Sequence, residues 1–198
     1  MMYTKDFAFI HVPKTAGMSI KKSIEMNCPD AIYMPKNTFS RKIEGDDWRR
    51  VMHYPYSYWE PLIKDKWVFS FVRNPYVRAV SFYVFYKTLY DFKERNQNLT
   101  FEDMFTKRYG NGLYVPTMTQ TECLTGLHER VPNVFKHEDG YAQLEKKLGF
   151  RIDQKRNVTP QYKYLDYYDE KRQKLILNLF EKDFENFSYD TELKNDIH

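Results

Sequence analysis

A short stretch near the N-terminus, HVPKTAGMSI, contains the residue types of a phosphate-binding loop in an unusual order. In the G-x-x-x-x-G-K-[ST] loop that binds nucleoside triphosphates, the lysine follows the last glycine. Here Lys14 precedes the single glycine of the stretch, Gly17, and a methionine follows that glycine. Backbone amides at the start of a helix, an ammonium group and hydroxyls can together surround an anion. We therefore expect an anion-binding loop lined by Pro13, Lys14, Thr15, Ala16, Gly17, Met18 and Ser19.

A second cluster of cations and hydroxyls occurs later in the chain, in FSFVRNPYVRAVSFY. Arg73 ends an apolar run, and Arg78 and Ser81 lie three residues apart, a spacing that puts them on one face of a helix. Taken alone, Arg78 and Ser81 are more often a solvated helix face or part of a helix–helix salt bridge. Together the two clusters predict two anion sites, and hence a ligand with two separated phosphate-like groups.

Two strand–turn–helix units must position these clusters. Phe7–Val12 is a short apolar run ended by a proline, which predicts a buried strand, and the spacing that follows predicts a helix over Gly17–Met26. Trp67–Val72 is rich in β-branched and aromatic residues, as buried strands are, and Asn74 is a favourable N-cap for the next helix. In open α/β sheets ligands bind beyond the carboxyl ends of the strands, where both clusters lie.

The remaining patterns alternate between helix and strand. Asn37–Pro61 is interpreted as a connection that contains one helical turn. The other elements that we expect are strands at Ala31–Met34 and Asn133–Lys136, and helices at Pro75–Phe92, Leu99–Lys107, Gln120–Leu124, His137–Leu148 and Tyr168–Phe187. This alternation predicts an α/β fold, a P-loop-like three-layer arrangement with a central, mostly parallel sheet flanked by helices.

Size and composition restrict the class of protein. With 198 residues, 42% hydrophobic and 29% charged, the chain fits one globular domain over residues 1–198. Its net charge of +4 is far below that of a protein that binds nucleic acid non-specifically. No apolar run is long enough to span a membrane, and no signal peptide precedes the first predicted strand. Two cysteines, Cys28 and Cys123, are too few for a disulfide framework and suit reduced thiols in the cytoplasm.

The two clusters resemble, in order and in context, the signature motifs of the sulfotransferases that use 3′-phosphoadenosine 5′-phosphosulfate. The closer resemblance is to the carbohydrate sulfotransferase branch, of the heparan sulfate 2-O-sulfotransferase type. QTECLTG is similar to the Gln-x-x-x-Leu-x-Gly segment of that branch, and NVFKHEDGYAQLEKKLGF, RNVTPQYKYLDYYDEK and LFEKDFENFSYD resemble its C-terminal portion. The resemblance covers nearly the whole chain and is poorest between Met34 and Met52.

This resemblance implies a role for each cluster. The first loop wraps the 5′-phosphosulfate of the donor, with Lys14 as the catalytic residue that reaches the oxygen between phosphate and sulfuryl group. Arg73 and Ser81 match the positions that hold the 3′-phosphate. The family usually has threonine at the position of Met18, so one hydroxyl contact to the 5′-phosphate is missing. The acceptor is a hydroxyl, in this branch that of a carbohydrate, and no metal is expected because a sulfuryl group carries less charge than a phosphoryl group.

Transfer to a hydroxyl requires a base. His53 lies twenty residues before Arg73, where the resembling family often has a catalytic histidine, and an imidazole is suited to removing a proton near neutral pH. Glu60 and Asp65 are the alternative bases. His11, in the strand before the first loop, is interpreted as structural, although it can line the site.

Arg156, in the basic segment Lys155–Asn157, is interpreted as a donor-binding residue on a flap over the 3′-phosphate or the acceptor. Two other functions are compatible with the sequence. An atypical P-loop nucleotide or small-molecule kinase would require a Mg²⁺-holding aspartate and a Gly-Lys-[Ser/Thr] loop, and neither is recognisable. A non-catalytic relative that only binds the donor is compatible with Met18. Neither the acceptor nor the oligomeric state has a readable signal.

Overall fold

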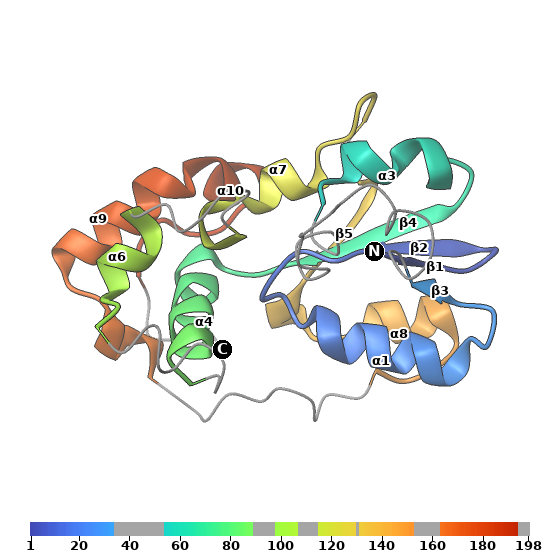
Figure 1. Ribbon diagram of the computed structural model, residues 1–198, viewed down its shortest axis with the longest axis horizontal. Helices are drawn as coiled ribbons and strands as arrows, with labels where there is room; N and C mark the ends of the chain where they lie inside the picture. Colours follow the sequence, from blue (N-terminus) through green and yellow to red (C-terminus); the bar gives the residue numbers. More distant parts are fainter. Residues whose placement is uncertain (34–53, 89–97, 107–114, 130, 153–162, 194–198) are drawn as a thin grey trace. The chain divides into compact units, whose positions relative to one another are not determined.

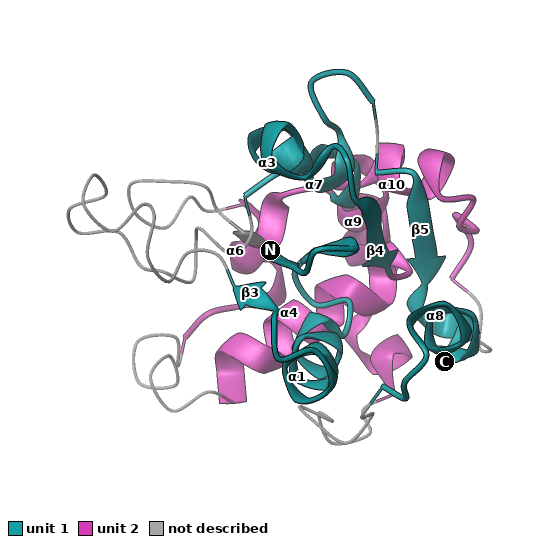
Figure 2. Ribbon diagram, turned by 90° about the vertical axis from the view of Figure 1, so that its right-hand side faces the viewer, with its two compact units in different colours: residues 1–72, 120–157 teal, residues 73–119, 158–198 magenta. Residues whose placement is uncertain are grey.

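The computed structural model describes residues 1–33, 54–88, 98–106, 115–129, 131–152 and 163–193. The chain divides into two compact units, coloured separately in Figure 2. We call residues 1–72 and 120–157 the sheet unit, because all strands of the described part of the chain belong to it. Residues 73–119 and 158–198 form the helical unit. The single domain expected over residues 1–198 stays a prediction.

The sheet unit contains a mixed sheet of five strands in the order β3-β1-β2-β4-β5. Its strands are β1 (Met2–Tyr3), β2 (Phe7–Ile10), β3 (Ile32–Tyr33), β4 (Trp67–Val72) and β5 (Asn133–Lys136). β2, β4 and β5 run parallel, whereas β1 pairs antiparallel with both β2 and β3. The expected parallel sheet therefore holds for these three strands. The edge differs because β1, a two-residue strand that was not predicted, pairs antiparallel with both of its neighbours.

β2 and β4 are adjacent and in register over the whole of β2, from Phe7 beside Trp67 to Ile10 beside Ser70. The Ser70 hydroxyl stabilises this register at the carboxyl end of β2, because its Oγ donates a hydrogen bond of 2.7 Å to the Ile10 carbonyl. Because the strands are parallel, their carboxyl ends lie at the same edge of the sheet. The residues that follow β2 and the residue that follows β4 both leave the sheet from this edge.

Helices cover both faces of the sheet, as Figure 1 shows. α1 (Gly17–Asn27) and α8 (Ala142–Leu148) lie on one face, and α3 (Tyr56–Ile63) lies on the other, in contact with α7 (Gln120–Leu124). The apolar cluster on the α1 side comprises Met2, Phe9, Ile20, Ile24, Phe69, Phe71, Tyr141, Leu144 and Ile152. The predicted α/β class, with a sheet flanked by helices, is confirmed. None of the helices in the described ranges is long and apolar enough to cross a membrane.

α3 is longer than the single turn expected in this part of the chain. It spans eight residues and contains Pro61, which removes one helical N–H donor but does not end the helix. Its buried residues, Tyr56, Trp59, Glu60 and Ile63, recur at the spacing of an amphipathic helix. The helical period was therefore present in the sequence, and Pro55 before the helix and Pro61 within it led to the shorter prediction.

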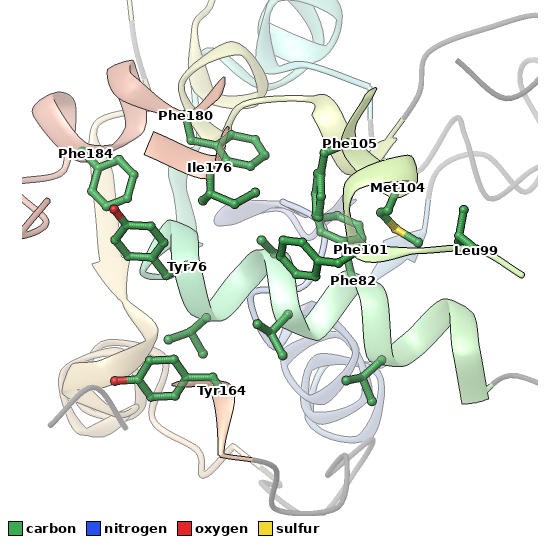
Figure 3. Packing of buried hydrophobic residues seen from close by; sticks show 14 residues of the cluster. Tyr76, Phe82, Leu99, Phe101, Met104, Phe105, Tyr164, Ile176, Phe180 and Phe184 are labelled. Carbon is green, nitrogen blue, oxygen red and sulfur yellow. The ribbon is translucent and has the colours of Figure 1, made fainter. Parts of the chain in front are cut away.

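The helical unit consists of α4 (Pro75–Thr88), α6 (Phe101–Thr106), α9 (Glu170–Leu179) and α10 (Glu181–Asn186), with short 3₁₀ turns at Val115–Thr117 and Tyr164–Tyr167. Figure 3 shows the aromatic core of this unit. Its buried members are Tyr76, Val77, Ala79, Val80, Phe82, Val84, Leu99, Phe101, Met104, Phe105, Tyr164, Ile176, Phe180 and Phe184.

Two helices predicted as continuous are interrupted. The helix expected over Tyr168–Phe187 breaks at Phe180, whose backbone (φ −116°, ψ 23°) is not helical. The helix expected over His137–Leu148 is a 3₁₀ turn followed by α8, with Gly140 at φ 72° between them. In the first case the apolar period continues through the break, so that periodicity alone could not reveal it.

Candidate functional site

The loop between β2 and α1 has an unusual backbone. Lys14 (φ 67°) and Ala16 (φ 65°) both lie in the left-handed region, although neither is glycine. Each such residue costs about 1–2 kcal/mol, and such strain persists only where the surrounding structure imposes it. Where left-handed residues alternate with right-handed ones, successive backbone N–H groups point into a common concavity that binds anions. The predicted anion-binding loop thus has the backbone of an anion-binding concavity.

The start of α1 is open to a negatively charged group. Ala16 occupies the N-cap position without a side-chain hydrogen bond, and the first turn of α1 contains no acidic residue. The Ala16 carbonyl accepts hydrogen bonds from the Ser19 and Ile20 amides, at 3.0 and 3.3 Å. Within α1 and its N-cap residue, neither a capping side chain nor a carboxylate therefore stabilises the positive end of the helix dipole, and an anion is stabilised at such an end.

The side chains of the loop differ in exposure. Lys14 is half-buried, Thr15 and Ser19 are buried, and Met18 is 40% exposed. The Thr15 hydroxyl donates its proton to the Val12 carbonyl at 2.9 Å, inside the loop. We therefore expect Thr15 to shape the loop rather than to donate a hydrogen bond to a ligand. The exposed Met18 lies on the surface of the loop.

Glycine is required at position 17 because the His11 ring lies close to its Cα atom. A Cβ atom on Gly17 would lie 1.9 Å from Cδ2 and 2.0 Å from Nε2 of His11, far inside contact distance. The buried His11 ring therefore packs against the backbone of the first residue of α1. This contact was not predicted, but the alternation Phe-x-Phe-x-His before a lone glycine was a signal for it.

The second cluster begins directly after β4. Asn74 caps α4 as predicted, since its Oδ1 accepts the Tyr76 amide at 2.9 Å and the Val77 amide at 3.4 Å. Arg73, the residue before this cap, is half-buried, and Ser81, two turns into α4, is buried. Both belong to the helical unit, whereas residues 13–19 belong to the sheet unit.

Arg78 is part of the helical core. It is 1% exposed, its Nη2 donates to the Met118 carbonyl at 2.8 Å, and its Nη1 lies 3.9 Å from the Asp183 carboxylate on α10. The guanidinium also lies over the rings of Phe82 and Phe180, at 5.0 and 5.4 Å. The alternative interpretation, a helix–helix salt bridge, is confirmed, and we no longer place Arg78 in an anion site.

The comparison with protein families agrees with both motifs. The model of the sulfotransferase family matches residues 1–125. The chain belongs to the sulfotransferase family. The match includes the loop at residues 13–19, position 53 and the segment from Arg73 to Ser81, and it ends before position 156. No curated protein and no solved structure matches the chain.

Membership of this family makes the protein a transferase of sulfuryl groups, which needs a base for its hydroxyl acceptor. Glu60, one alternative base, is 4% exposed and accepts hydrogen bonds from the Leu127 amide and, at 3.3 Å, from the His128 amide. A Cβ atom on Gly126 would lie 2.4 Å from the Glu129 carbonyl oxygen and 2.4 Å from Glu60 Oε2, which explains the glycine of QTECLTG. Glu60 thus anchors the segment after α7.

Asp65, the other alternative base, is exposed and lies two residues before β4, at the amino end of that strand. The loop that begins at Pro13 leaves the opposite, carboxyl edge of the sheet. Because six residues of strand span roughly 20 Å, Asp65 is too far from this edge to act there. The structure thus argues against both alternative bases.

Two predicted site residues of the sulfotransferase, His53 and Arg156, lie outside the described residues. The structure brings Pro13 to Ser19 together as one loop, and it puts Arg73 and Ser81 on the chain just before α4 and within it. Among the described residues, no group of three His, Cys, Asp or Glu side chains could hold a metal ion.

Proposed function

We propose that this sulfotransferase transfers a sulfuryl group from 3′-phosphoadenosine 5′-phosphosulfate to a hydroxyl of a carbohydrate acceptor. The observation that carries the proposal is the loop before α1, where Lys14 and Ala16 have left-handed backbone and the helix start has no acidic residue and no side-chain cap. An anionic group of a ligand is suited to such a helix start. We further propose that residues 1–198 form one domain of the heparan sulfate 2-O-sulfotransferase type.

The bound donor supplies an activated sulfuryl group, whose bond to the 5′-phosphate oxygen breaks as a new bond forms to the acceptor oxygen. Negative charge develops on that phosphate oxygen as it leaves. The Lys14 ammonium and the amides of residues 15–18 stabilise this charge. Because the strained loop holds these donors in place before the reaction, they need no reorganisation during it.

Arg73 and Ser81 hold the 3′-phosphate of the donor in this proposal, and Arg156 closes over it. Replacing Arg73 with alanine should weaken binding of 3′-phosphoadenosine 5′-phosphate by about one to two orders of magnitude, since a hydrogen bond to a charged group contributes about 1.5–3 kcal/mol. Isothermal titration measures this. Adenosine 5′-phosphosulfate, which lacks the 3′-phosphate, is the control ligand, and its affinity should not change. Equal losses for both nucleotides would contradict the assignment.

His53 removes the proton of the acceptor hydroxyl in this proposal. Its position in the sequence supports the role, as do the anchored carboxylate of Glu60 and the distant position of Asp65. Replacing His53 with alanine should lower turnover by about two orders of magnitude, as loss of a general base does, with donor affinity retained. Asp65→Asn is the matched control and should keep full activity. Normal turnover of the His53 variant would exclude it as the base.

One experiment separates the proposal from a kinase and from a non-catalytic relative. The protein should bind 3′-phosphoadenosine 5′-phosphate in isothermal titration and should not bind ATP with Mg²⁺. Mass spectrometry of an assay with the sulfate donor and a panel of oligosaccharides, glycolipids and small alcohols should detect a sulfated carbohydrate. Binding without any sulfated product would leave a donor-binding relative, and binding of ATP with Mg²⁺ would favour the kinase. The cytoplasmic location expected from the cysteines stays a prediction.

A further inference from the structure

A row of aromatic rings on β2 ends at the start of the anion-binding loop. Phe7 and Phe9 contact the Phe69 ring of β4, with centroids 5.9 and 5.3 Å apart. His11 continues the row, since its ring is stacked on Phe9 at 5.8 Å with an angle of 24° between the planes. Phe9 packs with Ile20 and Ile24 of α1, so the His11 ring stacked on it lies on the α1 side of the sheet.

The His11 ring meets α1 where a side chain cannot fit. A Cβ atom on Gly17 would come within 2.0 Å of two ring atoms and 2.8 Å of a third, Cγ. This contact joins the two ends of the loop, because His11 precedes it and Gly17 begins the helix that follows it. The five residues between them include both left-handed positions, Lys14 and Ala16.

We propose that His11 is a positioning residue of this loop: its imidazole, packed against Gly17, holds the left-handed backbone that presents Lys14 and the start of α1 to the donor. Strained backbone persists only where surrounding groups over-determine it, and the ring is such a group. The Thr15–Val12 hydrogen bond inside the loop is a second one. That the ligand is the 5′-phosphosulfate rests on the proposed function, but the effect of His11 on the shape of the loop does not.

The experiment is a double-mutant cycle of His11→Ala and Gly17→Ala. Gly17→Ala in the native protein forces the new methyl group into the imidazole, whereas in the His11→Ala background the space is empty. The loss in the free energy of unfolding caused by Gly17→Ala should therefore be much smaller in that background, because the effects of substitutions at residues in contact are not additive. His11→Ala alone should lower kcat/KM about a hundredfold, the effect of a small misplacement of reacting groups, and should raise KM for the donor but not for the acceptor.

Hydrogen exchange of the ligand-free protein tests the inference without reference to the donor. His11→Ala should accelerate exchange of the amides of residues 12–20, while β4 and α8 retain their protection. Ser23→Ala, a buried change on α1 away from the loop, is the control and should leave loop exchange and donor KM unchanged. Should Gly17→Ala fail to fold, folding of the double variant would itself demonstrate the coupling.

Two outcomes would overturn the inference. One is an equal cost of Gly17→Ala in both backgrounds, and the other is unchanged exchange of residues 12–20 in His11→Ala. A native protein that does not bind 3′-phosphoadenosine 5′-phosphate would instead overturn the proposed donor. In that case hydrogen exchange of residues 12–20 still tests the role of His11. Failure of the proposed donor and failure of the inference about His11 are therefore distinguishable.

Discussion

Replacing Lys14 with alanine is expected to lower the turnover of sulfuryl transfer by roughly two to three orders of magnitude, as removal of one donor to a developing oxyanion does. The lysine side chain starts from a strained, left-handed residue directly before the helix start, and it is half-buried. In the proposed mechanism its charge lies near the oxygen that becomes negative as it leaves. The effect should appear in kcat, with a smaller loss of affinity for 3′-phosphoadenosine 5′-phosphate.

A matched control for this prediction is Lys22→Ala, which removes a half-buried lysine from α1, one and a half turns beyond the loop. Steady-state kinetics with saturating donor should give near-native turnover for the Lys22 variant. Lys21 is a poorer control, because it pairs with Glu25 at 3.2 Å and lies over the Tyr33 ring at 4.2 Å. Near-native turnover of Lys14→Ala would remove Lys14 from the stabilisation of the leaving group.

The elements around the site could be predicted because their signals are local. β4 and β5 have the predicted bounds, since their β-branched and aromatic residues stand between clear turn signals. The start of α4 follows from the Asn74 cap, whose hydrogen bonds lie within three residues. β3 lies within the strand predicted at Ala31–Met34 but is only two residues long. β1 was not predicted, because two residues are too few to show a strand pattern.

The site itself could be predicted only in part, for the same reason. The loop residues and Arg73 carry recognisable motifs. The role of Glu60 depends on amides more than sixty residues away, so the sequence offered it as a base, and the structure reveals an anchor. Arg78 likewise looked like an anion ligand, since its partners Met118 and Asp183 are remote in sequence. Contacts of this kind decide whether a charged residue is functional or structural.

Replacing Arg78 with alanine is expected to lower the free energy of unfolding by about 3–5 kcal/mol, the cost of removing one member of a buried ion pair. Arg78 and Asp183 are 1% and 0% exposed. The variant removes the ion pair of the buried Asp183 carboxylate with Arg78 and leaves the Met118 carbonyl without the Nη2 donor. It also removes the guanidinium from the rings of Phe82 and Phe180.

Urea denaturation of the native protein and of the variant measures this loss. Arg151→Ala, which removes an exposed arginine, is the matched control and should change stability by less than about 0.5 kcal/mol. The double variant Arg78→Met, Asp183→Asn should lose less than the sum of its single changes, because removing both charges leaves no buried charge without its partner. Additive losses would mean that the pair is not coupled.

Donor binding then separates the two interpretations of Arg78. As a core residue, it should affect stability far more than ligand affinity, so that a folded Arg78→Met variant binds 3′-phosphoadenosine 5′-phosphate with nearly native Kd. As an anion ligand, its loss should weaken the 3′-phosphorylated nucleotide selectively, as we expect for Arg73→Ala. The buried position of Arg78 and its carboxylate partner favour the first result. A guanidinium that is inaccessible to solvent and paired with Asp183 is not accessible to a ligand.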